Sequence, residues 1–222
     1  SARETIHLVA SQQAGREDWG NLEYLLDTAY QAGLNVSELS IENLGWNGEQ
    51  FVDLHQQPIQ HLFKLYPWEW LWEEPFSQFI DAKTHWIEPC WKMLLSNKAL
   101  LIELWKRHPH HPLLLETHAY DRQQNYSGKW VRKPVLAREG ANIHIIQNNI
   151  DCGAASGSFY FDDYDHAGYV MQRWAKTPLY DGMLPTLGLW MVGDQCAGMS
   201  IREDVYDVIG NDAHFACHYF VE

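Results

Sequence analysis

The fold class is indicated first by residues 6–41, which read IHLVASQQAGREDWGNLEYLLDTAYQAGLNVSELSI. The apolar run at residues 6–10 predicts a strand, and residues 18–32 carry apolar side chains at helical spacing before Gly33, which can cap a helix. Residues 36–41 predict a second strand. A strand, a helix and a strand in this order form a parallel pair, so we expect a small α/β layer at the N-terminal side.

The segments that follow extend this layer. Residues 59–66 predict a strand that ends before Pro67, and residues 68–80 predict a helical passage. An extended piece at residues 86–89 precedes a further helix at residues 98–108, for which Asn97 is a suitable cap.

From Leu113 the pattern changes to short strands between turns, at residues 113–117, 129–136, 143–147, 159–161, 169–174, 187–192, 197–203 and 214–221. Residues 193–195 predict a hairpin connection, and strands joined by short turns form antiparallel sheets. The sequence therefore predicts an α+β (mixed α/β) fold. We expect an α/β lobe with a Trp-rich helical segment over residues 1–120 and a β-rich lobe over residues 121–222.

Composition excludes several classes of partner. The chain has 222 residues and a formal net charge of −13, which disfavours nucleic acid and anionic membranes. No apolar run is long enough to span a membrane, and the first residues contain no apolar signal core. The 4 cysteines show no C-x-x-C spacing, as is usual for free thiols in a reducing compartment. We expect a soluble, cytoplasmic protein.

The aromatic content is unusual, because the chain contains 11 Trp and 11 Tyr. Six of the Trp lie between residues 68 and 105, at Trp68, Trp70, Trp72, Trp86, Trp91 and Trp105. An indole is large and its N–H needs a partner when buried, so the cluster indicates either a thick core or an aromatic binding surface. Because matching faces also carry Leu and Phe, we expect Trp68, Trp70, Trp91 and Trp105 to lie mostly in the core and in cleft walls.

The segment KPVLAREGANI, residues 133–143, is the strongest candidate for chemistry. A strand that ends in Lys133 leads into a loop with Arg138 and Gly140, where backbone N–H groups can surround a phosphate. A hairpin loop with an incidental arginine is the alternative. Lys98 lies at the start of a predicted helix, where its positive charge interacts unfavourably with the helix dipole; a bound anion would relieve this repulsion. A lysine on a solvated surface is the alternative.

The sequence contains no convincing pattern for a metal site. The histidines at positions 108, 110, 111 and 118 are interrupted by Pro109 and Pro112, which break the helix that a two-histidine zinc site needs. Residues 162–165 lack the glycine and glutamate offsets of a calcium loop. Serine-hydrolase, P-loop and dinucleotide-binding motifs do not occur.

Several stretches together resemble the C-terminal part of the glutathionylspermidine synthetase family. They are FKLYPWEW (63–70), EPCWK (88–92), NKALL (97–101), Lys133-Pro134 with residues 138–143, Gln172, Pro178 and residues 198–203. Two of the segments, REG (138–140) and YPWEW (66–70), are more similar to the stand-alone acid–amine ligase branch than to the bifunctional synthetase/amidase. The resemblance implies an ATP-grasp-type fold and the ATP-dependent joining of a carboxylate to an amine.

The resemblance also implies roles for individual residues. Lys98 and Lys133 match the two ATP-binding lysines, and Glu139 with Gly140 match a loop that closes over the phosphates. Gln172, Asp207 and Val208 match positions that line the nucleotide pocket. Arg138 matches a lid arginine and Arg202 a family arginine of the late hairpin, so both are candidate catalytic residues.

The family uses magnesium, but its R-x-D and E-x-N metal motifs do not occur here in matching context. We therefore expect no metal ligands within these 222 residues, a chain that is a fragment or truncated form, and weak or no turnover by it alone. The substrates implied are a glutathione-like carboxylate and a polyamine-like amine, joined through an acyl phosphate. The alternatives are a Trp-rich module for sugars or small ligands and a non-catalytic domain derived from a ligase.

Overall fold

The computed structural model describes residues 4–13, 15–80, 83–160, 164–210 and 212–221. The chain divides into two compact units, of which the first ends at Leu94 and the second begins at Leu95. The boundary expected from the sequence lies between residues 120 and 121 instead. The difference arises because helix α4 (Leu100–Arg107) contacts strand β7 (Thr117–Ala119), and because the Lys98 N–H donates to the Val135 carbonyl at 3.0 Å.

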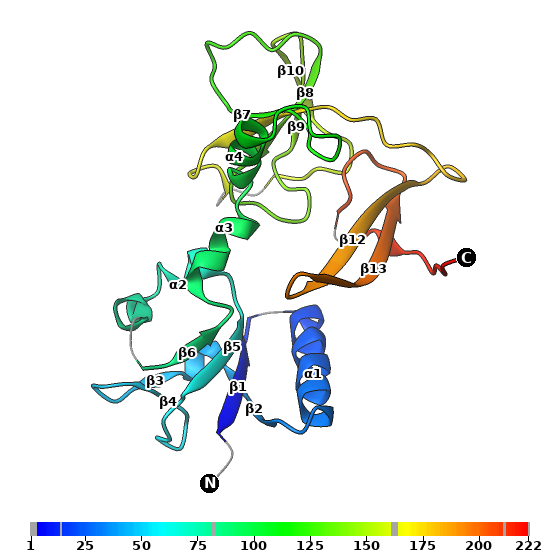
Figure 1. Ribbon diagram of the computed structural model, residues 1–222. Coiled ribbons are helices and arrows are strands. Elements are labelled where there is room, and N and C mark those ends of the chain that lie inside the picture. Colours follow the sequence, from blue (N-terminus) through cyan, green and yellow to red (C-terminus); the bar gives the residue numbers. More distant parts are fainter. Residues whose placement is uncertain (1–3, 14, 81–82, 161–163, 211, 222) are drawn as a thin grey trace. The chain divides into compact units, whose positions relative to one another are not determined.

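The first unit contains the α/β layer that the sequence predicts. Strand β1 (Thr5–Ala10), helix α1 (Arg16–Gln31) and strand β2 (Asn35–Ser40) form the strand–helix–strand unit, and Figure 1 shows α1 running beside β1 and β2. Strands β5 (His61–Leu65) and β6 (His85–Ile87) complete a parallel sheet of order β2-β1-β5-β6. The prediction of a parallel α/β layer is confirmed.

Short elements surround this sheet. They are η1 (Ile41–Asn43), β3 (Gly45–Trp46), β4 (Phe51–Val52), α2 (Trp68–Leu71), η2 (Pro75–Phe79) and η3 (Cys90–Lys92), with α3 (Met93–Ser96) at the unit boundary. The predicted single helical passage over residues 68–80 is two short helices instead. Pro75 stands at the first position of η2, where its missing N–H is tolerated, so it starts a new helix and cannot continue α2.

The tryptophan cluster is split between core and surface. Trp68 and Trp86 belong to the core cluster of the first unit, beside Phe51 and Leu62. The expectation that Trp70 and Trp91 lie in the core is wrong, because 43% of Trp70 and 57% of Trp91 is exposed. Trp70 follows Trp68 by two positions on a short helix, so the two side chains face different directions.

The packing of this core predicts a measurable loss of stability for a small deletion. Ile59 is 1% exposed within the core cluster, and we expect Ile59→Val to lower the free energy of unfolding by about 0.5–1.5 kcal/mol. Ile150→Val removes the same methylene group from a side chain that is 68% exposed. This control should therefore change the free energy of unfolding by less than about 0.5 kcal/mol. Urea unfolding of both variants provides the measurement, and equal losses would contradict the core assignment of Ile59.

The second unit is rich in antiparallel strands, as the sequence predicts. One sheet has the order β10-β9-β8-β11-β7 and contains β8 (Lys129–Pro134), β9 (His144–Gln147), β10 (Ile150–Ala154) and β11 (Tyr169–Arg173). The other contains β12 (Leu184–Val192), β13 (Gln195–Asp204) and β14 (His214–Phe215). Strands β12 and β13 form a hairpin about residues 193–194, which confirms the predicted connection (Figure 1).

Some predicted strands are shorter or missing. Of residues 113–117 only Thr117 is in a strand, because the segment turns after Pro112 and Leu113 is 87% exposed. Residues 159–160 form no strand, and residue 161 lies outside the described part of the chain. Beyond β14, residues 216–221 are not in a strand, and Phe220 is 79% exposed and packs against no core. Within the described ranges, no helix is long and apolar enough to cross a membrane.

Candidate functional site

A cleft of about 370 Å³ lies within the second unit, over the sheet that contains β8 and β11. Residues from several predicted strands and loops line it. Among them are five of the residues singled out from the sequence, namely Lys133, Gly140, Gln172, Asp207 and Val208. The cleft thus brings together five predicted residues that lie up to 75 positions apart, from residue 133 to residue 208.

Lys133 and Gln172 form the floor of the cleft through strand register. Gln172 on β11 is opposite Val131 on β8 and Thr117 on β7, and Lys133 is two residues from Val131. Residues that are opposite one another, or two apart on one strand, share a face of the sheet. Accordingly, the Lys133 Nζ donates to the Gln172 Oε1 at 2.7 Å, and the Gln172 Nε2 donates to the Thr117 Oγ1 at 3.1 Å.

This chain of hydrogen bonds fixes a lysine ammonium in a largely buried position. Burial lowers the pKa of Lys133, since the charged form loses solvation. Gln172 is only 7% exposed and supplies one neutral acceptor, so the ammonium retains donors for an anionic ligand.

Lys98 provides a second cation near Lys133. The Asn97 Oδ1 accepts the Ala99 N–H at 2.8 Å, but α4 begins at Leu100 with Ala99 at its N-cap and no side-chain cap, so the predicted helix start at Lys98 with Asn97 as cap is wrong. The Lys98 Nζ donates to the Ala137 carbonyl at 2.6 Å. Burial first, and then the charges of Lys133 and Arg138, lower the pKa of Lys98 to about 8. Like charges repel when they are close, so the three cations form a site that an anion with several charges would stabilise.

The loop after β8 is held by its backbone conformation and by one close contact. Gly140 has φ +78°, and a Cβ on it would lie 2.3 Å from the Val208 Cγ1. The Ser158 Oγ donates to the Gly140 carbonyl at 2.6 Å and accepts the Ile143 N–H at 2.9 Å. Gly140 is therefore required both for the positive φ and for the approach of Val208.

The remaining predicted residues do not line the cleft. Glu139 is exposed with φ +55°, and Arg138 is half-buried close enough to Lys98 to act on its pKa. The Arg202 Nη2 donates to the Gly210 carbonyl at 2.7 Å, and its guanidinium lies 5.5 Å from the Phe215 ring centroid. Arg202 thus stabilises the segment that follows β13, and its catalytic role stays a prediction.

Several cleft residues were missed in the sequence. They include Leu115, Val131, Trp174, Thr177, Thr186 and Ile209, whereas Ile143 belongs to the segment that the sequence singled out. Strand register could have indicated Val131, because it is opposite Gln172. Nothing in the sequence indicates Thr186 or Ile209, since the fold alone brings them to Lys133.

The donor set of the cleft suits phosphate groups better than a metal ion. Asp207 is the one carboxylate among the described lining residues, whereas Lys133 lines the cleft and Lys98 and Arg138 lie close to it. No group of three or more His, Cys, Asp or Glu side chains able to hold a metal is found in the described ranges. Magnesium binding normally requires oxygen ligands, so a metal that accompanies ATP would need ligands other than these.

A family model described as glutathionylspermidine synthase preATP-grasp matches residues 1–221. Three relatives are similar over nearly the whole chain. A Haemophilus influenzae protein named "Putative acid--amine ligase" is 50% identical over 100% of this chain and 58% of its own length. Trypanothione synthetase of Crithidia fasciculata is 24% identical over 95% of this chain and 35% of its own length.

The third relative is the bifunctional glutathionylspermidine synthetase/amidase of Escherichia coli, which is 23% identical over 96% of this chain and 38% of its own length. The higher identity to the Haemophilus protein agrees with the expected similarity to the acid–amine ligase branch. In each case the chain spans less than two thirds of the relative's length.

Proposed function

Because the chain belongs to the glutathionylspermidine synthase preATP-grasp family, we propose that it forms the ATP-binding part of an ATP-dependent acid–amine ligase. The observation that carries the proposal is the cleft in which Lys133 is bonded to Gln172 beside Gly140 and Val208, with Lys98 and Arg138 close by. These are residues that the family resemblance assigns to the nucleotide.

The residues divide the work by their chemistry. Lys98 and Lys133 bind phosphate oxygens, and the loop with Glu139 and Gly140 covers them. Arg138, on the same loop, stabilises the charge that develops on the transferred phosphoryl group. Gln172, Asp207 and Val208 line the nucleotide pocket, and Arg202 orders the late hairpin near it. Magnesium, held by ligands outside these residues, would help neutralise the phosphates.

The reaction proceeds in two steps that balance. A substrate carboxylate oxygen attacks the γ-phosphorus, the bond to the β-phosphate oxygen breaks, and an acyl phosphate and ADP form. The amine then attacks the acyl carbon, phosphate leaves, and an amide forms with loss of one proton. A closed loop is needed because water would otherwise hydrolyse the acyl phosphate.

The names of two relatives support glutathione-like and polyamine-like substrates, since one is a trypanothione synthetase and another a glutathionylspermidine synthetase/amidase. We propose these as substrate classes, together with a cytoplasmic location.

Binding of ATP to the folded chain tests the proposal. We expect saturable binding of ATP with magnesium in a calorimetric titration, and none of simple sugars, which a Trp-rich binding module would bind instead. A folded chain that binds sugars and does not bind ATP would contradict the proposal.

The pKa of Lys98 predicts how this affinity depends on pH. The protonated lysine binds phosphate, and its pKa of about 8 means that the free chain loses this proton as the pH rises through 8. Binding must then restore the proton, so we expect affinity to fall by up to about tenfold per pH unit above 8. Titrations from pH 7 to 9.5 at constant ionic strength provide the measurement. Lys98→Gln should flatten the profile, and the same slope in both proteins would contradict the assignment.

A further inference from the structure

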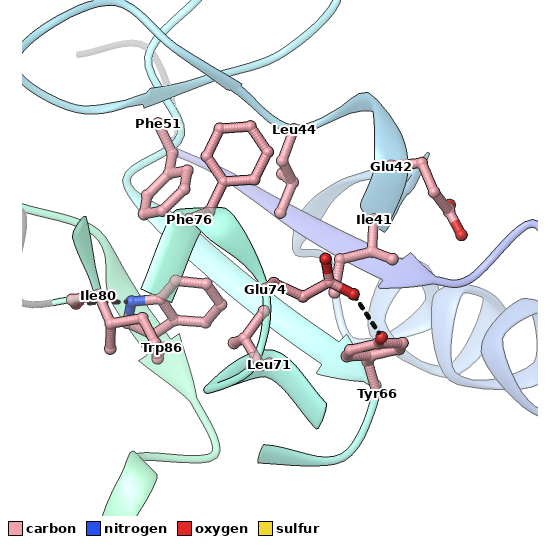
Figure 2. A pocket seen from close by; sticks show the side chains of 10 residues that line it. All are labelled: Ile41, Glu42, Leu44, Phe51, Tyr66, Leu71, Glu74, Phe76, Ile80 and Trp86. Carbon is pink, nitrogen blue, oxygen red and sulfur yellow. Dashed lines mark hydrogen bonds between the residues drawn. The ribbon is translucent and has the colours of Figure 1, made fainter. Parts of the chain in front are cut away.

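The first unit contains a second pocket, smaller than the cleft, with a volume of about 60 Å³. Figure 2 shows the aromatic rings of Phe51, Phe76 and Trp86 gathered on one side and Tyr66 with Glu74 on the other. One water needs about 10–15 Å³ of such space, so the pocket accommodates a short chain of a few heavy atoms.

The walls of the pocket are apolar. Phe51 is 1% exposed and meets Phe76 and Trp86 edge to face, with ring centroids 6.2 and 5.5 Å away. The one polar atom of Trp86 is satisfied, because its Nε1 donates to the Ile80 carbonyl at 3.1 Å. The aromatic surfaces therefore offer apolar contact, and ring faces that attract a cation.

The rim of the pocket is acidic. The Tyr66 hydroxyl donates to the Glu74 Oε1 at 2.9 Å, which leaves the other carboxylate oxygen available to a ligand (Figure 2). Glu42 also lines the pocket, and its carboxylate accepts from the Ser11 Oγ at 2.6 Å and from the Gln12 N–H at 3.0 Å.

The two ionisable groups beside Glu74 are in defined protonation states. Burial first, then the hydrogen bond and charge of Glu74, raise the pKa of Tyr66 to about 12, and the charges of Glu42 and Glu73 act in the same direction. Burial opposes ionisation of Glu42, but the hydrogen bonds from Ser11 and Gln12 outweigh it and lower the pKa of this carboxyl. At neutral pH the tyrosine is therefore a neutral donor and Glu42 a carboxylate.

No Lys, Arg or His is among the described residues that line the pocket. Lys64, on the neighbouring strand β5, is directed to the Tyr66 carbonyl, to which its Nζ donates at 2.7 Å, and lies 4.0 Å from the Trp68 ring centroid. The only charged groups among the described lining residues are therefore carboxylates, which would repel an anion. A neutral ligand would not neutralise them.

We propose that this pocket binds the end of an aliphatic chain that carries a primary ammonium group. The methylene groups lie against Phe51, Phe76 and Trp86, and the ammonium donates to the Glu74 carboxylate at the rim. The residues that line this pocket all belong to the first unit, and the inference does not rest on ATP binding in the cleft of the second unit.

The test uses the full 222-residue chain and n-butylammonium chloride as the probe, with n-butanol and sodium butyrate as matched neutral and anionic chains. The Trp86 indole N–H resonance, assigned with Trp86→Phe, reports occupancy in NMR spectra. We expect a saturable shift with butylammonium only. An equal response to n-butanol, which would mean a merely apolar pocket, or no response from the folded chain, would overturn the proposal.

Two variants distinguish binding in the pocket from attraction by the general negative charge of the surface. Glu74→Gln removes the charge but keeps an acceptor for Tyr66, and we expect it to weaken butylammonium binding by at least about tenfold. Glu73→Gln removes the same charge from a residue outside the lining, and should change binding by less than about twofold. Equal losses would overturn the proposal. ATP titration of Glu74→Gln should match the unchanged chain, so failure here is distinguishable from failure of the proposed ligase function.

Discussion

Replacement of Lys133 by methionine should weaken ATP binding by at least about 100-fold, which corresponds to about 3 kcal/mol. Lys133 is a largely buried cation whose Nζ is held by Gln172 at 2.7 Å, at the floor of the cleft. Removing it leaves a phosphate oxygen without a charged partner in a place from which water is partly excluded. Calorimetric titration with ATP and magnesium measures the loss.

The fold should survive this substitution, because methionine has a similar length and removes a buried charge that the protein solvates poorly. Lys106→Met is the matched control, since Lys106 is an exposed lysine that pairs with Glu103 at 2.8 Å. We expect it to change ATP affinity by less than about twofold. If both variants bind ATP equally well, Lys133 does not contact the nucleotide.

The parts of the fold that were predictable are those in which local pattern and packing agree. The apolar spacing before Gly33 predicted α1, and the short apolar runs on either side predicted β1 and β2. Strands β3 and β4 were not predicted, since two residues each carry no periodicity. They form because they pair with each other and because β4 also pairs with the segment at Pro58 and Ile59. Tertiary packing thus decides the short elements.

The candidate site was predictable only in part. Lys133 was singled out because it precedes a loop that can surround a phosphate, and Lys98 because it starts a predicted helix; the family resemblance then assigned both to the nucleotide. The structure places them near enough for the charge of Lys133 to lower the pKa of Lys98. Thr117 was not singled out, although it accepts a hydrogen bond from Gln172. Its place depends on the register of β7 against β11, which no local pattern specifies.

Gly140→Ala should disrupt the phosphate-covering loop. Gly140 has φ +78°, a conformation that costs a residue with a Cβ about 1–2 kcal/mol. Its new methyl would also lie 2.3 Å from the Val208 Cγ1, and relieving that overlap should cost a further 1–3 kcal/mol or so. We therefore expect the free energy of unfolding to fall by about 2–5 kcal/mol, together with weaker ATP binding.

Gly182→Ala separates strain from overlap. Gly182 has φ +85° but no heavy atom within 4 Å of the position of its Cβ, so this variant should lose only about 1–2 kcal/mol and should bind ATP normally. Val208→Ala in the Gly140→Ala background removes the overlapping methyl and should restore part of the stability, because it leaves the strain and a contact of 3.3 Å with the Ile209 carbonyl oxygen. Urea unfolding and ATP titration of the three proteins provide the measurements. If Gly140→Ala is no worse than Gly182→Ala in either measurement, the contact between the loop and Val208 does not shape the cleft, since strain alone would then account for the whole effect.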